Sequence, residues 1–241
     1  MSHNVFHFQQ FSVNQDKTAM KISTDGVLFG ACCNFENAEN ILDIGTGTGL
    51  LSLMAAQKSA AKITAVEIDN DAYLQAEENV KNSKFSDRIK IFHGDFLTFY
   101  KTCGEKYGYI ISNPPFFENA FKSNDYKRNF ARHTDSLPFE KMILGVKEII
   151  LENGFFSVII PFDKSLDFVR LCALSKLHLC KKISVFSKSN VPPLRVILTF
   201  SKQILPMKYD EITIYEKNKT YSEKFKELTK DFYLKNNVCF A

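Results

Sequence analysis

The sequence has no apolar stretch that approaches the roughly 18 residues needed to cross a membrane. Its start, MSHNVFHFQQF, lacks the basic-then-apolar pattern of a secretory signal peptide. Neither a membrane-spanning nor a secreted protein is therefore favoured. We expect a cytoplasmic protein with no membrane partner.

Cysteine is present, but its spacing matches neither a redox motif nor a metal site. The six cysteines form no CxxC pair, and none is spaced with a histidine as metal ligands are. They are residues 32, 33, 103, 172, 180 and 239. We expect reduced thiols that pack as small apolar side chains, and no metal site.

The chain also lacks internal repeats and low-complexity linkers. Its 241 residues suffice for one large domain. We predict a single domain over 1–241, made of an N-terminal segment (1–35), a core (36–202) and a C-terminal strand and helix (203–241). No interface pattern stands out, and we expect a monomer.

From about residue 40, apolar runs typical of buried strands alternate with segments whose apolar residues recur at helical spacing. The predicted strands are 40–45, 62–69, 88–95, 107–112, 154–161, 178–188, 193–202 and 210–217. The predicted helices are 50–59, 70–83 (capped by Asn70 or Asp71), 137–151 (with Pro138 in its first turn), 163–176 and 222–234. This alternation favours an α/β fold with a mostly parallel sheet and helices on both faces. The short connections after residue 178 favour an antiparallel, hairpin-like edge.

A glycine loop, LDIGTGTG (42–49), links the first of these strands to the first helix. Its glycines permit a tight turn and let a ligand approach free backbone N–H groups. A dinucleotide fingerprint would read GxGxxG, with the helix start on a pyrophosphate. Here the spacing is GxGxG behind an acid, and an anion suits a cationic ligand better. S-adenosylmethionine carries an ammonium and a sulfonium, so we predict a site for it at Asp43, Gly45, Thr46, Gly47 and Gly49.

Two further acids follow the next two strands. Glu67 can accept both ribose hydroxyls, and Asp95 can accept the exocyclic amine of the donor's adenine. Ile68 and Phe96 would flank the adenine ring. Since parallel α/β sheets bind ligands at the carboxyl ends of their strands, three acids at three successive ends predict a single donor site.

The motif NPPF (113–116) follows the fourth strand. An aromatic amine is a poor nucleophile, because its lone pair is delocalised into the ring. The amide oxygen of Asn113 and the carbonyl of Pro114, held rigid beside Pro115, can accept its two N–H bonds and favour a tetrahedral nitrogen. Phe116 can stack on the base, which offsets part of the few kcal/mol needed to unstack it.

A basic and aromatic segment, 117–136, comes next. Its position beside the acceptor motif favours contact with a phosphate backbone. The net charge of +4 and pI near 8.6 agree with such a partner without requiring it. The predicted RNA-binding residues are Lys122, Lys127, Arg128, Arg132 and His133.

Together these motifs resemble those of class I S-adenosylmethionine-dependent methyltransferases of the N6-adenine type. More closely, the chain is similar to the bacterial family that methylates N6 of adenine 37 in tRNA1(Val). Two other stretches carry this resemblance, FQQFSVNQDKTAMKISTDGVLFGA (8–31) and YSEKFKELTKDFYL (221–234). The resemblance therefore covers nearly the whole chain.

The resemblance implies a Rossmann-like, seven-stranded sheet with an antiparallel last strand. It implies methyl transfer from S-adenosyl-L-methionine to adenine in tRNA, with S-adenosyl-L-homocysteine as product. Lys21, Thr24 and Asp25 match the family's N-terminal signature, and Thr24 and Asp25 are expected near the donor.

Other functions stay open at this point. Enzymes that methylate guanine N2 in ribosomal RNA can also carry NPPF, whereas the glutamine-N5 methyltransferases of release factors carry NPPY. A non-catalytic RNA-binding protein is disfavoured by the intact glycine loop. A nicotinamide-binding oxidoreductase is disfavoured by Asp43 and the GxGxG spacing.

Overall fold

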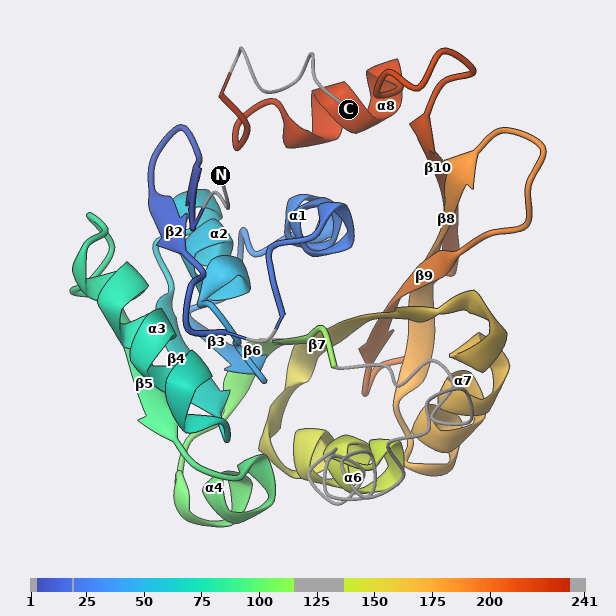
Figure 1. The fold of residues 1–241 in the computed structure, drawn as a ribbon. Helices are drawn as coiled ribbons and strands as arrows, with labels where there is room; N and C mark the ends of the chain where they lie inside the picture. Colours follow the sequence, from blue (N-terminus) through green and yellow to red (C-terminus); the bar gives the residue numbers. More distant parts are fainter. Residues whose placement is uncertain (1–3, 19, 115–136, 235–241) are drawn as a thin grey trace, which may run out of the picture.

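The computed structural model describes residues 4–18, 20–114 and 137–234 of the chain. Its centre is a sheet with the strand order β10-β8-β9-β7-β6-β3-β4-β5 (Figure 1). The strands are β3 (Asn40–Ile44), β4 (Lys62–Glu67), β5 (Ile89–His93), β6 (Tyr107–Ser112), β7 (Ile150–Pro161), β8 (His178–Lys188), β9 (Arg195–Ser201) and β10 (Lys208–Tyr215).

One strand of this sheet, β9, is antiparallel to both of its neighbours. It pairs antiparallel with both β7 and β8, whereas β3, β4, β5, β6 and β7 pair in parallel. This arrangement confirms the predicted α/β fold with a mostly parallel sheet.

Strand β10 corrects two expectations. It is an eighth strand of the described sheet, where the resemblance implies seven, and it pairs parallel to β8, where the resemblance implies an antiparallel last strand. The antiparallel hairpin predicted after residue 178 is formed by β8 and β9. The reason for the parallel pairing of β10 is topological. Both sides of β9 are already paired, so the chain that leaves its end adds at the free side of β8, starting from the end where β8 itself begins.

Helices cover both faces of the sheet, as predicted (Figure 1). One face packs against α1 (Thr24–Cys32), α2 (Leu50–Lys58), α3 (Asn70–Lys81) and α8 (Glu223–Thr229), and the other against α4 (Phe96–Thr102), α6 (Phe139–Ile149) and α7 (Ser165–Leu174). Neighbouring residues of β3 point to opposite cores, with Ile41 in the first and Leu42 in the second. A short 3₁₀ helix, η1 (Phe162–Lys164), precedes α7.

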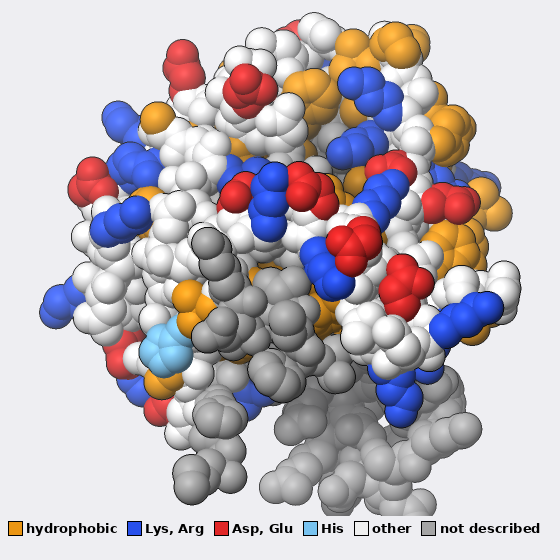
Figure 2. Space-filling view, turned by 90° about the horizontal axis from the view of Figure 1, so that it is seen from above, with side chains coloured by type: hydrophobic (Ala, Val, Ile, Leu, Met, Phe, Trp, Pro, Cys, Tyr) orange, Lys and Arg blue, Asp and Glu red, His pale blue; other side chains and the backbone are white. Residues whose placement is uncertain are grey.

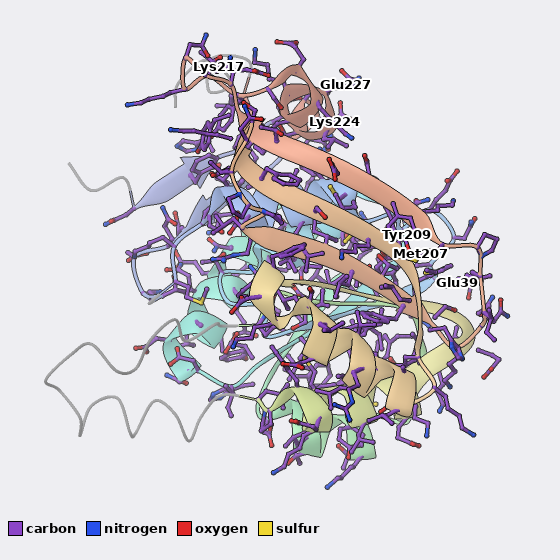
Figure 3. The ribbon with its side chains drawn as sticks, turned by 90° about the vertical axis from the view of Figure 1, so that its right-hand side faces the viewer. Glu39, Met207, Tyr209, Lys217, Lys224 and Glu227 are labelled. Carbon is purple, nitrogen blue, oxygen red and sulfur yellow. The ribbon has the colours of Figure 1, made fainter. Side chains whose placement is uncertain are left out.

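Helix α8 also contacts β10, the outermost strand on that side (Figure 3). The ammonium of Lys224 donates to the carboxylate of Asp210 and, at 2.7 Å, to the carbonyl oxygen of Glu211. Tyr209, directly before Asp210 on β10, is 76% exposed. The charged Asp210 side chain on this edge strand opposes edge-to-edge pairing with another sheet.

Several helices and strands of the structure are not predicted from the sequence pattern. These are the hairpin of β1 (Val5–His7) and β2 (Ser12–Asn14), and helices α1 and α4. Helix α1, TDGVLFGAC, is apolar around most of its circumference, so it shows no helical periodicity. Helix α4 has only seven residues.

Element boundaries also shift by a few residues. The cap of α3 is Asp69, not Asn70 or Asp71, because the Asp69 carboxylate accepts the N–H of Ala72 at 2.8 Å. Pro138 lies at the cap position of α6, one residue before its first turn. Among the described helices, none is both long enough and apolar enough to cross a membrane.

Gly145 on α6 sets how closely α4 approaches. A Cβ atom at this position would lie 2.7 Å from ring carbons of both Phe96 and Tyr100. Gly145→Ala should therefore lower the free energy of unfolding by about 1–3 kcal/mol, because the overpacked rings must shift. Chemical denaturation measures this change. The exposed Glu148→Ala on the same helix is the control, and an equal effect of both variants would refute the packing argument.

Candidate active site

The carboxyl ends of four neighbouring strands meet at one edge of the sheet. In the registers of β3 with β4 and β6, Ile44 faces Val66 and Ser112, and in β4 with β5, Glu67 faces His93. The glycine loop, Glu67, Asp95 and Asn113 therefore follow neighbouring strand ends. The strands thus bring these residues to one edge of the sheet, and their binding of a common ligand stays a prediction.

The glycine loop needs its glycines for conformation. Gly45, Gly47 and Gly49 have φ values of 71°, 58° and 81°, in the left-handed region that favours glycine. The N–H groups of Gly45 and Thr46 both donate to the carbonyl oxygen of Val66, at 2.9 and 3.3 Å. A Cβ atom added at Gly45 or Gly47 would meet no atom within 4 Å, so these two glycines border open space.

Asp43 lies under this loop and is fully buried. Its Oδ2 accepts the hydroxyls of Thr46 and Ser52 at 2.6 and 2.8 Å. Its Oδ1 has no hydrogen-bond partner in the part of the chain that the structure describes. Burial raises the pKa of Asp43 to about 6, and the nearby Glu67 adds to this, although the two hydroxyl donors oppose it. A cation or another donor would stabilise the charged form.

Glu67 ends β4 and is 7% exposed. Its Oε2 accepts the N–H of Gly47 at 2.8 Å, and its Oε1 accepts the N–H of Asp69 at 3.0 Å. The carboxylate therefore fixes the glycine loop from one side. Each oxygen keeps further lone-pair capacity for a ligand hydroxyl.

The residues predicted around the adenine ring divide into two kinds. Asp95 caps α4, where its Oδ1 accepts the N–H of Leu97 at 3.0 Å, and Ile68 is 53% exposed at the sheet edge. Phe96 is only 4% exposed, because its ring packs against Tyr100 and α6 in the second core. In this structure Phe96 is a core residue and offers little surface to a ligand, contrary to the expectation for it.

Thr24 and Asp25, expected near the donor, make contacts within the chain. The Asp25 carboxylate pairs with the Arg195 guanidinium at 3.1 Å. This ion pair joins the first turn of α1 to β9. Burial raises the pKa of Tyr221, and the Thr24 side chain lowers it. Lys21 donates to the backbone carbonyl oxygen of Gln15.

Asn113 lies beside both the glycine loop and α1. The preceding Ser112 donates its hydroxyl to the carbonyl oxygen of Ile44 at 2.9 Å, which joins the ends of β6 and β3. A Cβ atom on Gly26 would lie 3.8 Å from the amide nitrogen of Asn113, so the first turn of α1 approaches this side chain. Pro114 is buried.

The remaining predicted residues lie outside the described part of the chain. They are Pro115, Phe116, Lys122, Lys127, Arg128, Arg132 and His133.

Sequence reasoning missed two side chains at this edge. Ser52 falls within an apolar helix, and its bond to Asp43 spans nine residues, a separation that no local pattern marks. Arg195 meets Asp25 across 170 residues of sequence. Only the three-dimensional structure reveals either contact.

Comparison with known proteins extends this picture. Residues 27–137 match the Methyltransferase small domain. The tRNA1(Val) (adenine(37)-N6)-methyltransferase of Trichodesmium erythraeum is 41% identical over 238 residues, which cover 98% of this chain and 100% of that protein. The enzyme of the same name from Christiangramia forsetii is 43% identical over 239 residues, with the same coverage.

The chain belongs to the tRNA1(Val) (adenine(37)-N6)-methyltransferase family. This membership confirms the resemblance that the sequence motifs indicate.

Solved structures agree with the family's fold. A predicted O-methyltransferase from Agrobacterium tumefaciens superposes with a TM-score of 0.68 at 17% identity, covering 86% of this chain and 96% of its own. A methyltransferase from Pyrococcus furiosus gives 0.51 at 20% identity, covering 73% and 81%. At these identities the comparison confirms the class I methyltransferase fold.

The pKa of Asp43 generates a pH prediction. Because the native pKa lies above the ordinary 3.8, this group's contribution to the free energy of unfolding is fully present below pH 3.8 and is lost as pH rises through about 6. Asp43→Asn keeps an acceptor for both hydroxyls and avoids that loss. At pH 7.5 the variant should be more stable than the wild type by about 1–3 kcal/mol in denaturant titrations.

The same substitution should weaken binding of S-adenosylhomocysteine about 10- to 100-fold at pH 7.5, because the cationic amine loses a charged partner. Wild-type affinity should fall below pH 6, while the variant should show no such step. Calorimetric titration across pH measures both, with the exposed Asp71→Asn as control. Equal affinities and equal pH profiles for wild type and Asp43→Asn would contradict the assignment of Asp43.

Proposed function

We propose that this chain transfers the methyl group of S-adenosyl-L-methionine to the exocyclic N6 of adenine 37 in tRNA1(Val). The observation that carries the proposal is the neighbourhood of Asp43 and Asn113. A buried carboxylate with an unpaired oxygen lies under an open glycine loop, and an Asn-Pro pair follows the strand beside it. The names of the relatives supply the substrate.

The described residues fit this donor. The unpaired Oδ1 of Asp43 suits a cationic amine, and the open space over Gly45 and Gly47 leaves room for a ligand against the loop backbone. Glu67 and Asp95 would hold the ribose hydroxyls and the adenine amine, with Ile68 against the ring. When bound, the donor supplies an electrophilic methyl group on a sulfonium.

On the acceptor side, Asn113 provides an amide oxygen that can accept one N–H of the adenine amine, and the Pro114 carbonyl can accept the other. Two acceptors in fixed positions draw the nitrogen out of conjugation and orient its lone pair. Once the nitrogen carries a fourth substituent, its proton is acidic and can leave to solvent. No general base is required, so His133 is assigned to RNA contact.

The tRNA-binding surface belongs to the same proposal. On the face seen from above in Figure 2, acidic and basic side chains are interspersed, and no extended field of one sign is visible. A phosphate backbone binds where positive charge gathers. The assignment of RNA contact to Lys122, Lys127, Arg128, Arg132 and His133 is argued from their place in the sequence directly after NPPF, because these residues lie outside the described part of the chain. A monomer is part of the same proposal.

The test is methyl transfer from labelled donor to tRNA1(Val) that lacks its own modifications, followed by nucleoside analysis. N6-methyladenosine at position 37 is the expected product. Label on guanine or on release-factor glutamine would leave the donor site intact and refute the substrate.

Asn113→Ala should lower kcat at least about 100-fold, because a group that orients the reacting nitrogen is lost. Binding of S-adenosylhomocysteine should stay within about threefold of wild type. Asn37→Ala, in an exposed turn before β3, is the matched control. Near-normal turnover of Asn113→Ala would refute the role of this amide.

A further inference from the structure

Helix α3 buries two amide side chains, Gln75 and Asn79, which are 0% and 2% exposed. Polar groups at such depth cost free energy unless their hydrogen bonds are made. Their contacts therefore show what each amide holds in place.

Asn79 joins two segments that are far apart in sequence. Its Nδ2 donates to the carbonyl oxygens of Thr48 and Asn14, both at 2.9 Å. Its Oδ1 accepts the backbone N–H of Asn14 at 2.7 Å. Both amide hydrogens and the amide oxygen are thus used, and every bond goes to a backbone group.

The first of these segments is the glycine loop. Thr48 immediately precedes Gly49, and a Cβ atom on Gly49 would lie 3.5 Å from the Cβ of Ala76, one turn before Asn79 on α3. Glu67 holds the N–H of Gly47 from the other side. The loop backbone is therefore fixed between a carboxylate on β4 and an amide on α3.

The second is the N-terminal segment. After Asn14, the N–H of Lys17 donates to Oε1 of Gln75 at 3.0 Å, and the chain continues to the first turn of α1. There Gly26 approaches Asn113. Asn79 therefore lies where the donor loop meets the segment that leads to the acceptor asparagine.

We propose that Asn79 is a positioning residue that holds the glycine loop and the N-terminal segment in a fixed relation. It touches no reacting atom. Through Thr48 it keeps the loop backbone in its donor-binding conformation, and through Asn14 it anchors the segment that leads to α1, whose first turn approaches Asn113. Gln75 anchors the N-terminal segment alone.

The difference between the two amides gives a matched experiment. Asn79→Asp and Gln75→Glu each replace a buried amide by an acid of nearly the same shape, so the cost of burying the acid is comparable. Each keeps its acceptor for a backbone N–H. Only Asn79→Asp loses donors that the structure shows in use, because Nε2 of Gln75 has no partner among the described residues.

Isothermal titration with S-adenosylhomocysteine, at least 15 °C below each variant's Tm, is the measurement. Asn79→Asp should raise Kd at least about tenfold, whereas Gln75→Glu should change it by less than about threefold despite a similar fall in Tm. Equal changes in Kd would show that both amides contribute only to stability, and would overturn the proposal. Binding of this ligand needs no RNA, so the result is independent of the proposed tRNA substrate.

A second pair of variants tests the proposal if either acidic variant does not fold. Asn79→Ser and Gln75→Ser are smaller and neutral. Hydrogen exchange should accelerate at both 45–50 and 14–17 in Asn79→Ser, and near Lys17 alone in Gln75→Ser. Unchanged exchange at 45–50 in Asn79→Ser would contradict the positioning role.

Discussion

The burial of one carboxylate, Asp43, is the constraint on which the active site depends. A charged group at zero exposure is costly, and this one has two hydroxyl donors on one oxygen and, among the described residues, no partner on the other. The loop above it closes only with three left-handed glycines. A buried carboxyl group thus lies beneath an open stretch of backbone, a combination that supports the proposed site for a cationic donor.

The parallel sheet sets the distance between the glycine loop and Asn113. Strands β3 and β6 are neighbours, so the donor loop and Asn113 leave the sheet about 5 Å apart, the ordinary spacing of paired strands. Ser112 ties these two ends together. Two helices then pack against these segments. Helix α3 contacts the glycine loop, and α1 approaches Asn113. The glycine loop and Asn113, for which we propose donor and acceptor roles, thus both leave the same sheet at neighbouring strands.

The sequence predicts those features of the structure that depend on residues close together in the chain. Apolar runs identify the strands, and Asp43, Glu67 and Asp95 lie near the carboxyl ends of β3, β4 and β5, the edge at which parallel α/β sheets bind ligands. Helix α1 is missed because it is apolar on most sides, and the orientation of β10 depends on which sheet edge is free. Phe96 cannot be assigned from its neighbours, since α6, which packs on it, follows much later in the chain. The pairs Asp25–Arg195 and Asn14–Asn79 are likewise long-range.

The most direct test of this account is the titration of Asp43 itself. Carboxyl ¹³C NMR, assigned with the Asp43→Asn variant, follows its ionisation with and without S-adenosylhomocysteine. The account predicts a pKa of about 6 in the free protein, since burial disfavours the charged form, and a lower pKa in the complex, since the ligand's ammonium favours it. A pKa near the ordinary 3.8 in both states would contradict the claim that an unneutralised carboxylate organises the donor site.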